Sequence, residues 1–155
     1  MTKNLIAILF VLTLALGCPS TGGPGDGLEI CAGGDCVCPD EETCELVCEE
    51  ESDCNVDCND DSTCDVDCND STDACNVECA SGTDCGVTCG AAESCSVQCV
   101  NATECEVDCE DATDCQVTCP DGNCVVHNCA LMEGCTVSCG NMGIPTQSGS
   151  DAICE

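Results

Sequence analysis

The sequence predicts an all-β protein: a disulfide-stapled parallel β-solenoid, or β-helix, built from ten-residue repeats. Three observations lead to this prediction. A Cys-x-Val-x-Cys unit recurs about every ten residues between Cys44 and Cys139, and a fixed period marks units that stack on their neighbours. The residues between the units are mostly turn formers such as Asp, Asn, Ser and Gly. The chain has 25 cysteines among 155 residues, which is typical of a disulfide scaffold.

Each unit is expected to form a strand. Side chains alternate along a strand, so the two cysteines and the valine of Cys54–Cys58 share one face, while Asn55 and Asp57 share the other. The units are rich in Val, Asp, Asn, Thr and Ser, which are poor helix formers. The pattern therefore predicts strands with an apolar inner face and a polar outer face.

The cysteine spacing predicts bridges around the turns. The two cysteines of one strand would lie about 13 Å apart, which is too far for a disulfide. The end of one unit and the start of the next can instead be joined. This rule gives Cys48–Cys54, Cys58–Cys64, Cys68–Cys75, Cys79–Cys85, Cys89–Cys95, Cys99–Cys105, Cys109–Cys115, Cys119–Cys124 and Cys129–Cys135. The flanks add Cys31–Cys36, Cys38–Cys44 and Cys139–Cys154. Pairing between stacked coils is an alternative that also uses an even number of cysteines.

Two coil sizes fit the repeat. One unit per coil would resemble the small disulfide-braced solenoids of insect antifreeze proteins, and two units per coil would resemble pentapeptide-repeat proteins and larger parallel β-helices. Two units are favoured because a ten-residue coil leaves little interior. Turns carry a small third residue that we expect to point inward, namely Gly82, Ala92, Ala102 and Ala112. An extra residue within 69–74 and a lengthened unit at 124–129 predict bulges or corners.

The first 17 residues are expected to be a signal peptide. A short segment with Lys3 precedes the apolar run from Leu5 to Leu16, which suits an export signal. The run ends in Leu14-Ala15-Leu16-Gly17-Cys18, which resembles the lipobox of bacterial lipoproteins. Leu is commonest three positions before the cysteine of that motif, where this chain has Ala15, whereas the small Gly17 fits. The resemblance implies cleavage before Cys18, a lipid on that residue, and attachment to the outer membrane or cell surface. Plain secretion and an uncleaved anchor helix are the alternatives.

The rest of the chain divides by composition. Residues 18–27 form a Gly/Pro-rich tether after the lipidation site. Residues 28–43 and 140–155 are expected to be caps around the repeats of 44–139, since terminal repeats are commonly atypical. Lipidation of Cys18 would leave 24 cysteines, which close into twelve bridges. Such bridges favour an oxidising compartment.

The charge excludes several classes of function. The formal net charge is −30, the only basic side chain is Lys3 and the only aromatic is Phe10. Without a cationic patch, nucleic-acid binding is not expected. His127 is the only histidine, and no Lys or Arg outside the signal can stabilise an oxyanion. The sequence therefore predicts a protein that is not an enzyme, with His127 as a surface residue.

The composition is compatible with two kinds of metal site. If consecutive units stacked in one ladder, they would align four carboxylates that could attract Ca²⁺, namely Asp57, Asp67, Glu78 and Asp108. The alternative is an acidic surface that only solvates the protein. A metal-thiolate protein would resemble metallothioneins, but their close cysteine spacings occur here only at Cys36-Val37-Cys38.

The sequence thus leads to one main hypothesis and two alternatives. The main hypothesis is an exported, membrane-anchored acidic lipoprotein that acts as a non-enzymatic structural or interaction module at the cell envelope. Its partner there, or outside the cell, is not specified by the sequence. The first alternative is a Ca²⁺-binding protein that uses a stacked acidic face, and otherwise no cofactor is expected. The second is a thiol-based buffer of metals or redox state.

Overall fold

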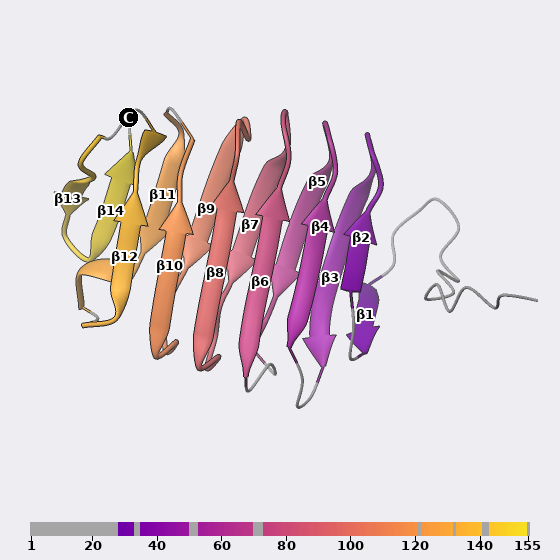
Figure 1. Cartoon of the computed structure of the whole chain (residues 1–155), viewed down its shortest axis with the longest axis horizontal. Helices are drawn as coiled ribbons and strands as arrows, with labels where there is room; N and C mark the ends of the chain where they lie inside the picture. Colours follow the sequence, from indigo (N-terminus) through magenta and orange to yellow (C-terminus); the bar gives the residue numbers. More distant parts are fainter. Residues whose placement is uncertain are drawn as a thin grey trace, which may run out of the picture.

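The computed structural model describes residues 28–32, 35–49, 53–69, 73–120, 122–131, 133–140 and 143–154. The chain in these ranges winds as a parallel β-solenoid with two sheets (Figure 1). The predicted signal peptide, the lipidated Cys18 and the tether of 18–27 lie outside the described residues. No helix within the ranges above has the length and apolar character that a membrane crossing requires.

The strands alternate between the two sheets along the chain. Sheet A has eight strands in the order β1-β3-β5-β7-β9-β11-β14-β13, and sheet B has six in the order β12-β10-β8-β6-β4-β2. The strands of sheet A are β1 (Leu28–Ala32), β3 (Thr43–Glu49), β5 (Thr63–Asp67), β7 (Asp84–Thr88), β9 (Glu104–Asp108), β11 (Cys124–His127), β14 (Asp151–Cys154) and β13 (Thr146–Ser148). Those of sheet B are β2 (Asp35–Cys38), β4 (Cys54–Cys58), β6 (Ala74–Cys79), β8 (Ser94–Cys99), β10 (Asp114–Thr118) and β12 (Cys135–Ser138).

Two units form one coil, which confirms the favoured coil size. Cys95 of β8 pairs in parallel with Cys115 of β10, and Cys44 of β3 pairs with Cys64 of β5. Both steps are 20 residues, from 115 − 95 and 64 − 44. The extra residue in 69–74 is absorbed before β6 begins, so Cys54 pairs with Cys75 without a break in the ladder. The repeat is thus a half-coil, and consecutive units lie on opposite sheets.

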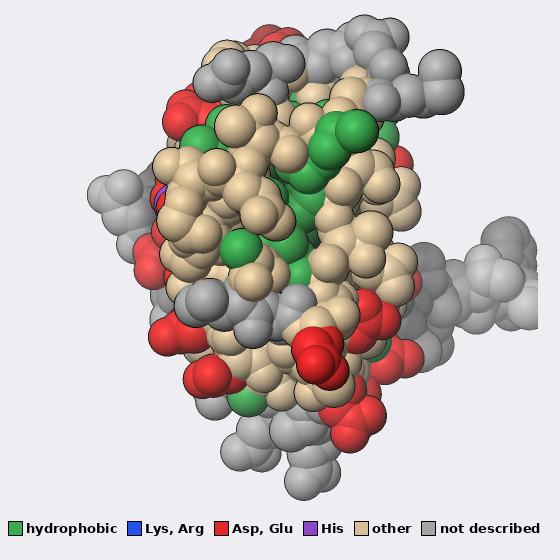
Figure 2. All heavy atoms as spheres, turned by 90° about the vertical axis from the view of Figure 1, so that its left-hand side faces the viewer, with side chains coloured by type: hydrophobic (Ala, Val, Ile, Leu, Met, Phe, Trp, Pro, Cys, Tyr) green, Lys and Arg blue, Asp and Glu red, His purple; other side chains and the backbone are tan. Residues whose placement is uncertain are grey.

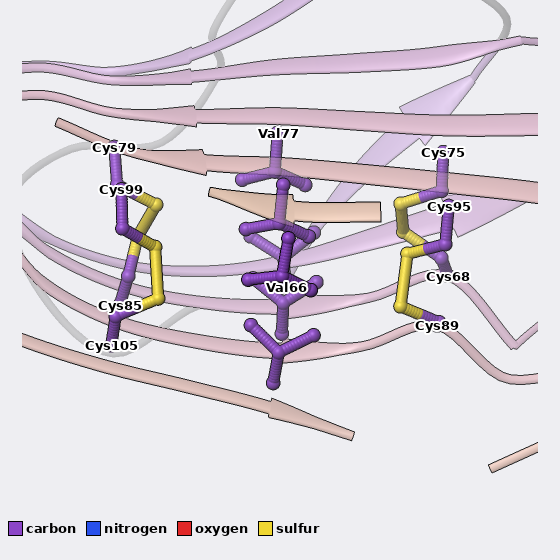
Figure 3. Close-up of a cluster of buried hydrophobic side chains, with 14 of the residues drawn as sticks. Val66, Cys68, Cys75, Val77, Cys79, Cys85, Cys89, Cys95, Cys99 and Cys105 are labelled. Atoms are coloured by element: carbon purple, nitrogen blue, oxygen red, sulfur yellow. A yellow bond between two sulfur atoms is a disulfide. The ribbon is translucent and has the colours of Figure 1, made fainter. Parts of the chain in front are cut away.

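Valines fill the interior between two columns of disulfides (Figure 3). The central valine of each inner strand is at most 3 % exposed, and Leu46 takes the same place in β3. Burying a valine side chain contributes about 1.5–3 kcal/mol, so a row of valines stabilises the stack without any aromatic residue. The buried valines are Val56, Val66, Val77, Val87, Val97, Val107, Val117 and Val126.

The bridges run around the corners, as the spacing predicts. The structure contains the same twelve pairs, with Cα–Cα distances from 5.3 to 6.5 Å. The first column joins each sheet B strand to the next sheet A strand, as in Cys99–Cys105. The second joins sheet A to sheet B, as in Cys109–Cys115. Each bridge closes a short loop and so lowers the conformational entropy of the unfolded chain. This effect stabilises the folded protein by about 2 kcal/mol per bridge.

The corners confirm only part of the expectation for small inward residues. Ala92, Ala102 and Ala112 are 0 to 9 % exposed, as predicted. The expectation was wrong for Gly82, because the buried residue of that turn is the next one, Thr83. Gly82 instead has a φ of +78°, and a Cβ there would collide with the Asp61 carboxylate of the neighbouring turn. Glycine is suited to this backbone conformation.

The C-terminal end differs from the repeats. After β11 comes the short 3₁₀ helix η1 (Cys129–Leu131), and later β14 adds to β11 in the antiparallel sense, followed by β13. The Cys139–Cys154 bridge ties this hairpin to the end of β12. Sheet A therefore extends beyond sheet B at this end. Seen end-on, apolar side chains appear in the middle of the molecule and acidic side chains at its rim (Figure 2).

Candidate functional site

The four carboxylates predicted to bind a metal do not form one ladder. Asp57 and Glu78 are paired neighbours on sheet B. Asp67 and Asp108 lie on sheet A, with Thr88 between them in the register. The prediction of a single ladder was wrong because consecutive units alternate between opposite faces of the solenoid. The prediction of one ladder assumed that each unit lies directly on the unit before it in the sequence.

The structure instead gathers carboxylates on the outer face of sheet A. Three rows of outward residues cross this face. One row contains Asp84 and Glu104, the next contains Asp65 and Glu106 with Gly86 between them, and the third contains Asp108 followed by His127. Adjacent strands are about 4.8 Å apart, so these side chains form a dense acidic surface. We call this surface the acidic face, defined by Asp65, Asp67, Asp84, Glu104, Glu106 and Asp108.

A shallow hollow of about 520 Å³ lies in the middle of the acidic face. Gly86 forms its floor because it contributes no side chain between Asp65 and Glu106. A Cβ at Gly86 would lie 3.6 Å from the nearest carboxylate oxygen of Asp65, which is ordinary contact. The hollow could therefore be filled by substitution without distorting the backbone. Its lining includes carboxylates, whose oxygens are the ligands that hard cations prefer.

His127 lies at the end of the acidic face, between two carboxylates. Its Nε2 is 3.0 Å from Glu106 Oε1, and its Nδ1 is 3.3 Å from Asp151 Oδ2. Burial alone would lower the pKa of His127, but the hydrogen bonds and charges of Glu106 and Asp151 outweigh it, so this pKa is raised. The hydrogen bond from the Ser150 hydroxyl is the main cause that lowers the pKa of Asp151, and Asn128 and His127 add to it.

The His127 contacts join the terminal hairpin to the solenoid. Asp151 begins β14, and Glu106 belongs to β9. A second contact supports the same junction, since the backbone N–H of Asn128 donates to Asp151 Oδ1 at 3.4 Å, while the Asn128 side-chain amide donates to Asp108 Oδ1 of β9 at 2.8 Å. His127 is thus a partly buried surface residue held between two strands. The arrangement fastens the cap, and the sequence did not indicate Asp151 because residues 140–155 carry no repeat pattern.

The outer face of sheet B has a different character. Its first strands carry Asp35, Asp57 and Glu78, whereas later positions in the same rows are neutral. An amide ladder runs along one row, with the Asn55 amide donating to Asp35 at 3.2 Å and the Asn76 amide donating to Asn55 at 3.0 Å. The neutral part of the face is formed by Ser96, Gln98, Gln116, Thr118, Thr136 and Ser138.

The cysteines offer a third kind of candidate site. The sulfurs of Cys58, Cys79 and Cys85 lie within 4.8 Å of one another, and so do those of Cys89, Cys109 and Cys115. All six are bridged, and only a thiolate is a good metal ligand. A metal-thiolate site would therefore require reduction of the bridges. The thiol-buffer hypothesis stays a prediction, which a count of free thiols in the exported protein tests.

Comparison of the chain with protein-family models, with curated proteins and with solved structures gives no match. The residues of the described ranges define a cysteine-rich parallel β-solenoid with corner disulfides and one strongly acidic outer face. So many disulfides indicate an oxidising or extracellular environment.

Proposed function

We propose that the protein is an exported acidic lipoprotein, anchored to the outer membrane or cell surface through Cys18, that acts as a non-enzymatic structural or interaction module. The observation that carries the proposal is the way each strand uses its side chains. Cysteine and valine on the inner face form the core, while the outer faces are polar and the strands behind them are joined by the corner bridges. Such a stack is a rigid support that presents surface side chains at constant spacing.

The anchor can be tested with the full chain expressed in a bacterial host. We expect the exported protein to fractionate with membranes, and its intact mass to correspond to residues 18–155 with a lipid and twelve disulfides. The Cys18→Ala variant should carry no lipid and should keep residues 1–17, whereas the matched Ser20→Ala variant should be cleaved and lipidated like the wild type. Wild-type protein without a lipid, or a Cys18→Ala variant cleaved before residue 18 as the wild type is, would contradict the lipid anchor.

A second candidate function is binding of a divalent cation by the acidic face. The hollow above Gly86 supports it, because Asp65, Asp84, Glu104 and Glu106 surround a floor with no side chain. Carboxylates at this density attract Ca²⁺. If the acidic face binds a macromolecule instead of a cation, the partner expected is one with a positively charged surface.

Calorimetric titration with Ca²⁺ tests this second function. At physiological ionic strength we expect saturable heat with the wild-type protein and its loss in Gly86→Val, which fills the hollow but keeps every carboxylate. The matched Ser96→Val variant changes the other face and should bind as the wild type does. Equal binding by Gly86→Val and wild type would mean that Ca²⁺ only screens the surface.

A further inference from the structure

Sulfur atoms of successive bridges touch along the second column of disulfides. Cys135 Sγ lies 4.0 Å from Cys109 Sγ, and Cys115 Sγ lies 4.0 Å from Cys89 Sγ. Sulfurs of intact disulfides carry no hydrogen, so these are van der Waals contacts between bridges. Both contacts join residues 26 apart, so two successive coils repeat one diagonal arrangement.

These contacts link three bridges into one continuous path. Cys109 is bonded to Cys115, and Cys89 is bonded to Cys95. Contacts and disulfide bonds therefore alternate between sulfur atoms from Cys135 in the last coil to Cys95, which lies two coils nearer the N-terminal end of the solenoid. We call this path the sulfur row, defined in order by Cys135, Cys109, Cys115, Cys89 and Cys95.

We propose that the sulfur row is a thiol–disulfide exchange relay, which carries an unpaired thiol between the C-terminal end of the solenoid and its interior. A Cys135 thiolate attacks Cys109 Sγ and forms a Cys109–Cys135 bond. The Cys109–Cys115 bond breaks, and its electron pair leaves on Cys115 Sγ. That thiolate in turn attacks Cys89 Sγ, which forms Cys89–Cys115 and releases Cys95. Each step exchanges one disulfide for another, so nothing is oxidised or reduced overall.

The open end of the stack provides the entrance to the relay. Cys135 is half-buried, whereas Cys89, Cys95 and Cys115 are fully buried. The end-on view shows apolar side chains in the middle of this end, where no further coil covers them (Figure 2). Cys129 is 9 % exposed and less accessible than Cys135. A small external thiol that attacks Cys129 Sγ would form a mixed disulfide there and release Cys135 as the first thiolate of the relay, whereas attack on Cys135 would release Cys129 and not start it.

The same contacts work in the outward direction during oxidative folding. A chain that first closes Cys89–Cys115 and Cys109–Cys135 leaves Cys95 and Cys129 unpaired. Attack of the Cys95 thiolate on Cys89 then releases Cys115, whose attack on Cys109 releases Cys135 beside Cys129, where an oxidant can close the last bridge. Burial in apolar surroundings raises the pKa of a thiol, so the reacting thiolate is scarce inside the stack. We therefore expect exchange to be slow, with the unpaired thiol found more often at Cys135 than at Cys115 or Cys95.

The Cys129→Ser variant tests the relay because it leaves Cys135 unpaired without any reductant. The folded variant is held at about pH 8, quenched with acid, alkylated and mapped by non-reducing peptide analysis. We expect about a tenth or more of the label on Cys115 and Cys95, together with new Cys109–Cys135 and Cys89–Cys115 peptides. These peptides should not form at about pH 4, where the thiolate is absent.

Two further variants separate the steps of the relay. Cys129→Ser/Cys89→Ala/Cys95→Ala removes the second acceptor, so label should appear on Cys135 and Cys115 and no farther. Cys129→Ser/Cys109→Ala/Cys115→Ala removes the first acceptor, so label should remain on Cys135. Label confined to Cys135 in the single variant, with Cys109–Cys115 and Cys89–Cys95 intact, would overturn the proposal. Label scattered over the other disulfide column would overturn it as well.

Wild-type protein gives a second measurement if the variants do not fold. With less than one equivalent of a small dithiol at about pH 8, we expect Cys109–Cys135 to appear while Cys129 is alkylated. Alkylation of Cys129 and Cys135 alone, with all other bridges unchanged, would contradict the relay.

Discussion

The outer faces of sheets A and B differ although the strands behind them are nearly identical. Both sheets repeat cysteine and valine on the inside with the same register. On the outside, sheet A carries carboxylates along its length, a gap at Gly86 and one histidine, whereas the strands of sheet B beyond β6 carry a single carboxylate, Asp114. The comparison teaches that the ten-residue period specifies the core, and that a twenty-residue period specifies the surface. Residues that distinguish one face from the other are the place to look for function.

The largest expected effect comes from breaking the interior that the two faces share. Val97 is completely buried in β8, and its neighbour Ser96 points outward on sheet B. Val97→Asp should destabilise the protein by more than about 4 kcal/mol because it buries an unpaired charge. Ser96→Asp places the same charge in water and should change stability by less than about 0.5 kcal/mol. Urea unfolding measures both, and equal losses would mean that the alternation of inner and outer residues is wrong.

Removing one corner bridge should have the next largest effect. Cys99→Ala/Cys105→Ala opens a bridge between the sheets in the middle of the stack and should cost about 2–5 kcal/mol. Thermal unfolding under non-reducing conditions measures the loss. Val100→Ala is a matched control in the same turn, because this side chain is 48 % exposed. A double variant as stable as the control would show that the bridges do not brace the two sheets.

The acidic face should respond to salt more than the face of sheet B. Carboxylates on sheet A repel one another, and salt screens exposed charges over about 10 Å at 0.1 M. Asp65→Asn/Glu104→Gln, which leaves the contact between Glu106 and His127 intact, should therefore raise stability by about 0.5–1 kcal/mol at low salt and by almost nothing at 1 M. Gln98→Glu adds a charge to the neutral part of sheet B and should have the opposite effect, a loss of stability at low salt that disappears at 1 M. A gain for the double variant that is independent of salt would exclude repulsion as the cause.

The smallest effect concerns the cap and depends on pH. The raised pKa of His127 means that its contribution is complete below its unfolded pKa of about 6.5 and is lost as pH rises through the folded value. The lowered pKa of Asp151 means that its contribution is present above about pH 4 and is lost as pH falls through its folded value.

The wild type should therefore exceed His127→Gln in melting temperature by the largest margin between about pH 4 and pH 6.5. The margin should shrink at higher pH. Differential scanning calorimetry across this range checks it, and Thr136→Gln provides a control on the other face. A margin that grows toward alkaline pH would contradict the contacts with Glu106 and Asp151.

The sequence was sufficient for the core and insufficient for the surface. Cysteines at strand ends have few partners within reach, so the bridges and the strand pattern could be predicted from spacing alone. The arrangement of Asp57, Asp67, Glu78 and Asp108 was predicted wrongly, because the carboxylates of consecutive units were placed in one ladder although two units per coil was the favoured size. With two units per coil these residues divide between opposite sheets, and the register shows that Gly86 interrupts a row of carboxylates.

Two other features needed the structure for different reasons. Asp61 and Asn101 adopt a positive φ in their turns, but Asp and Asn are also common in turns with negative φ. The turn conformation, and with it the turn residue that points into the core, could therefore not be assigned from the sequence. The antiparallel hairpin β13–β14 has no repeat, and its contact with His127 joins residues 24 apart (151 − 127) from unlike segments. Local periodicity contains no information about such a contact.

Non-reducing peptide mapping of the exported wild-type protein, alkylated in acid, is the most direct test of the two-sheet solenoid. We expect bridges only between neighbouring cysteines across a corner, such as Cys58–Cys64 and Cys89–Cys95, with no free thiol among residues 28–154. A bridge within one strand, such as Cys54–Cys58, would contradict the strands. A bridge between stacked coils in the untreated protein, such as Cys54–Cys75, would contradict the corner columns.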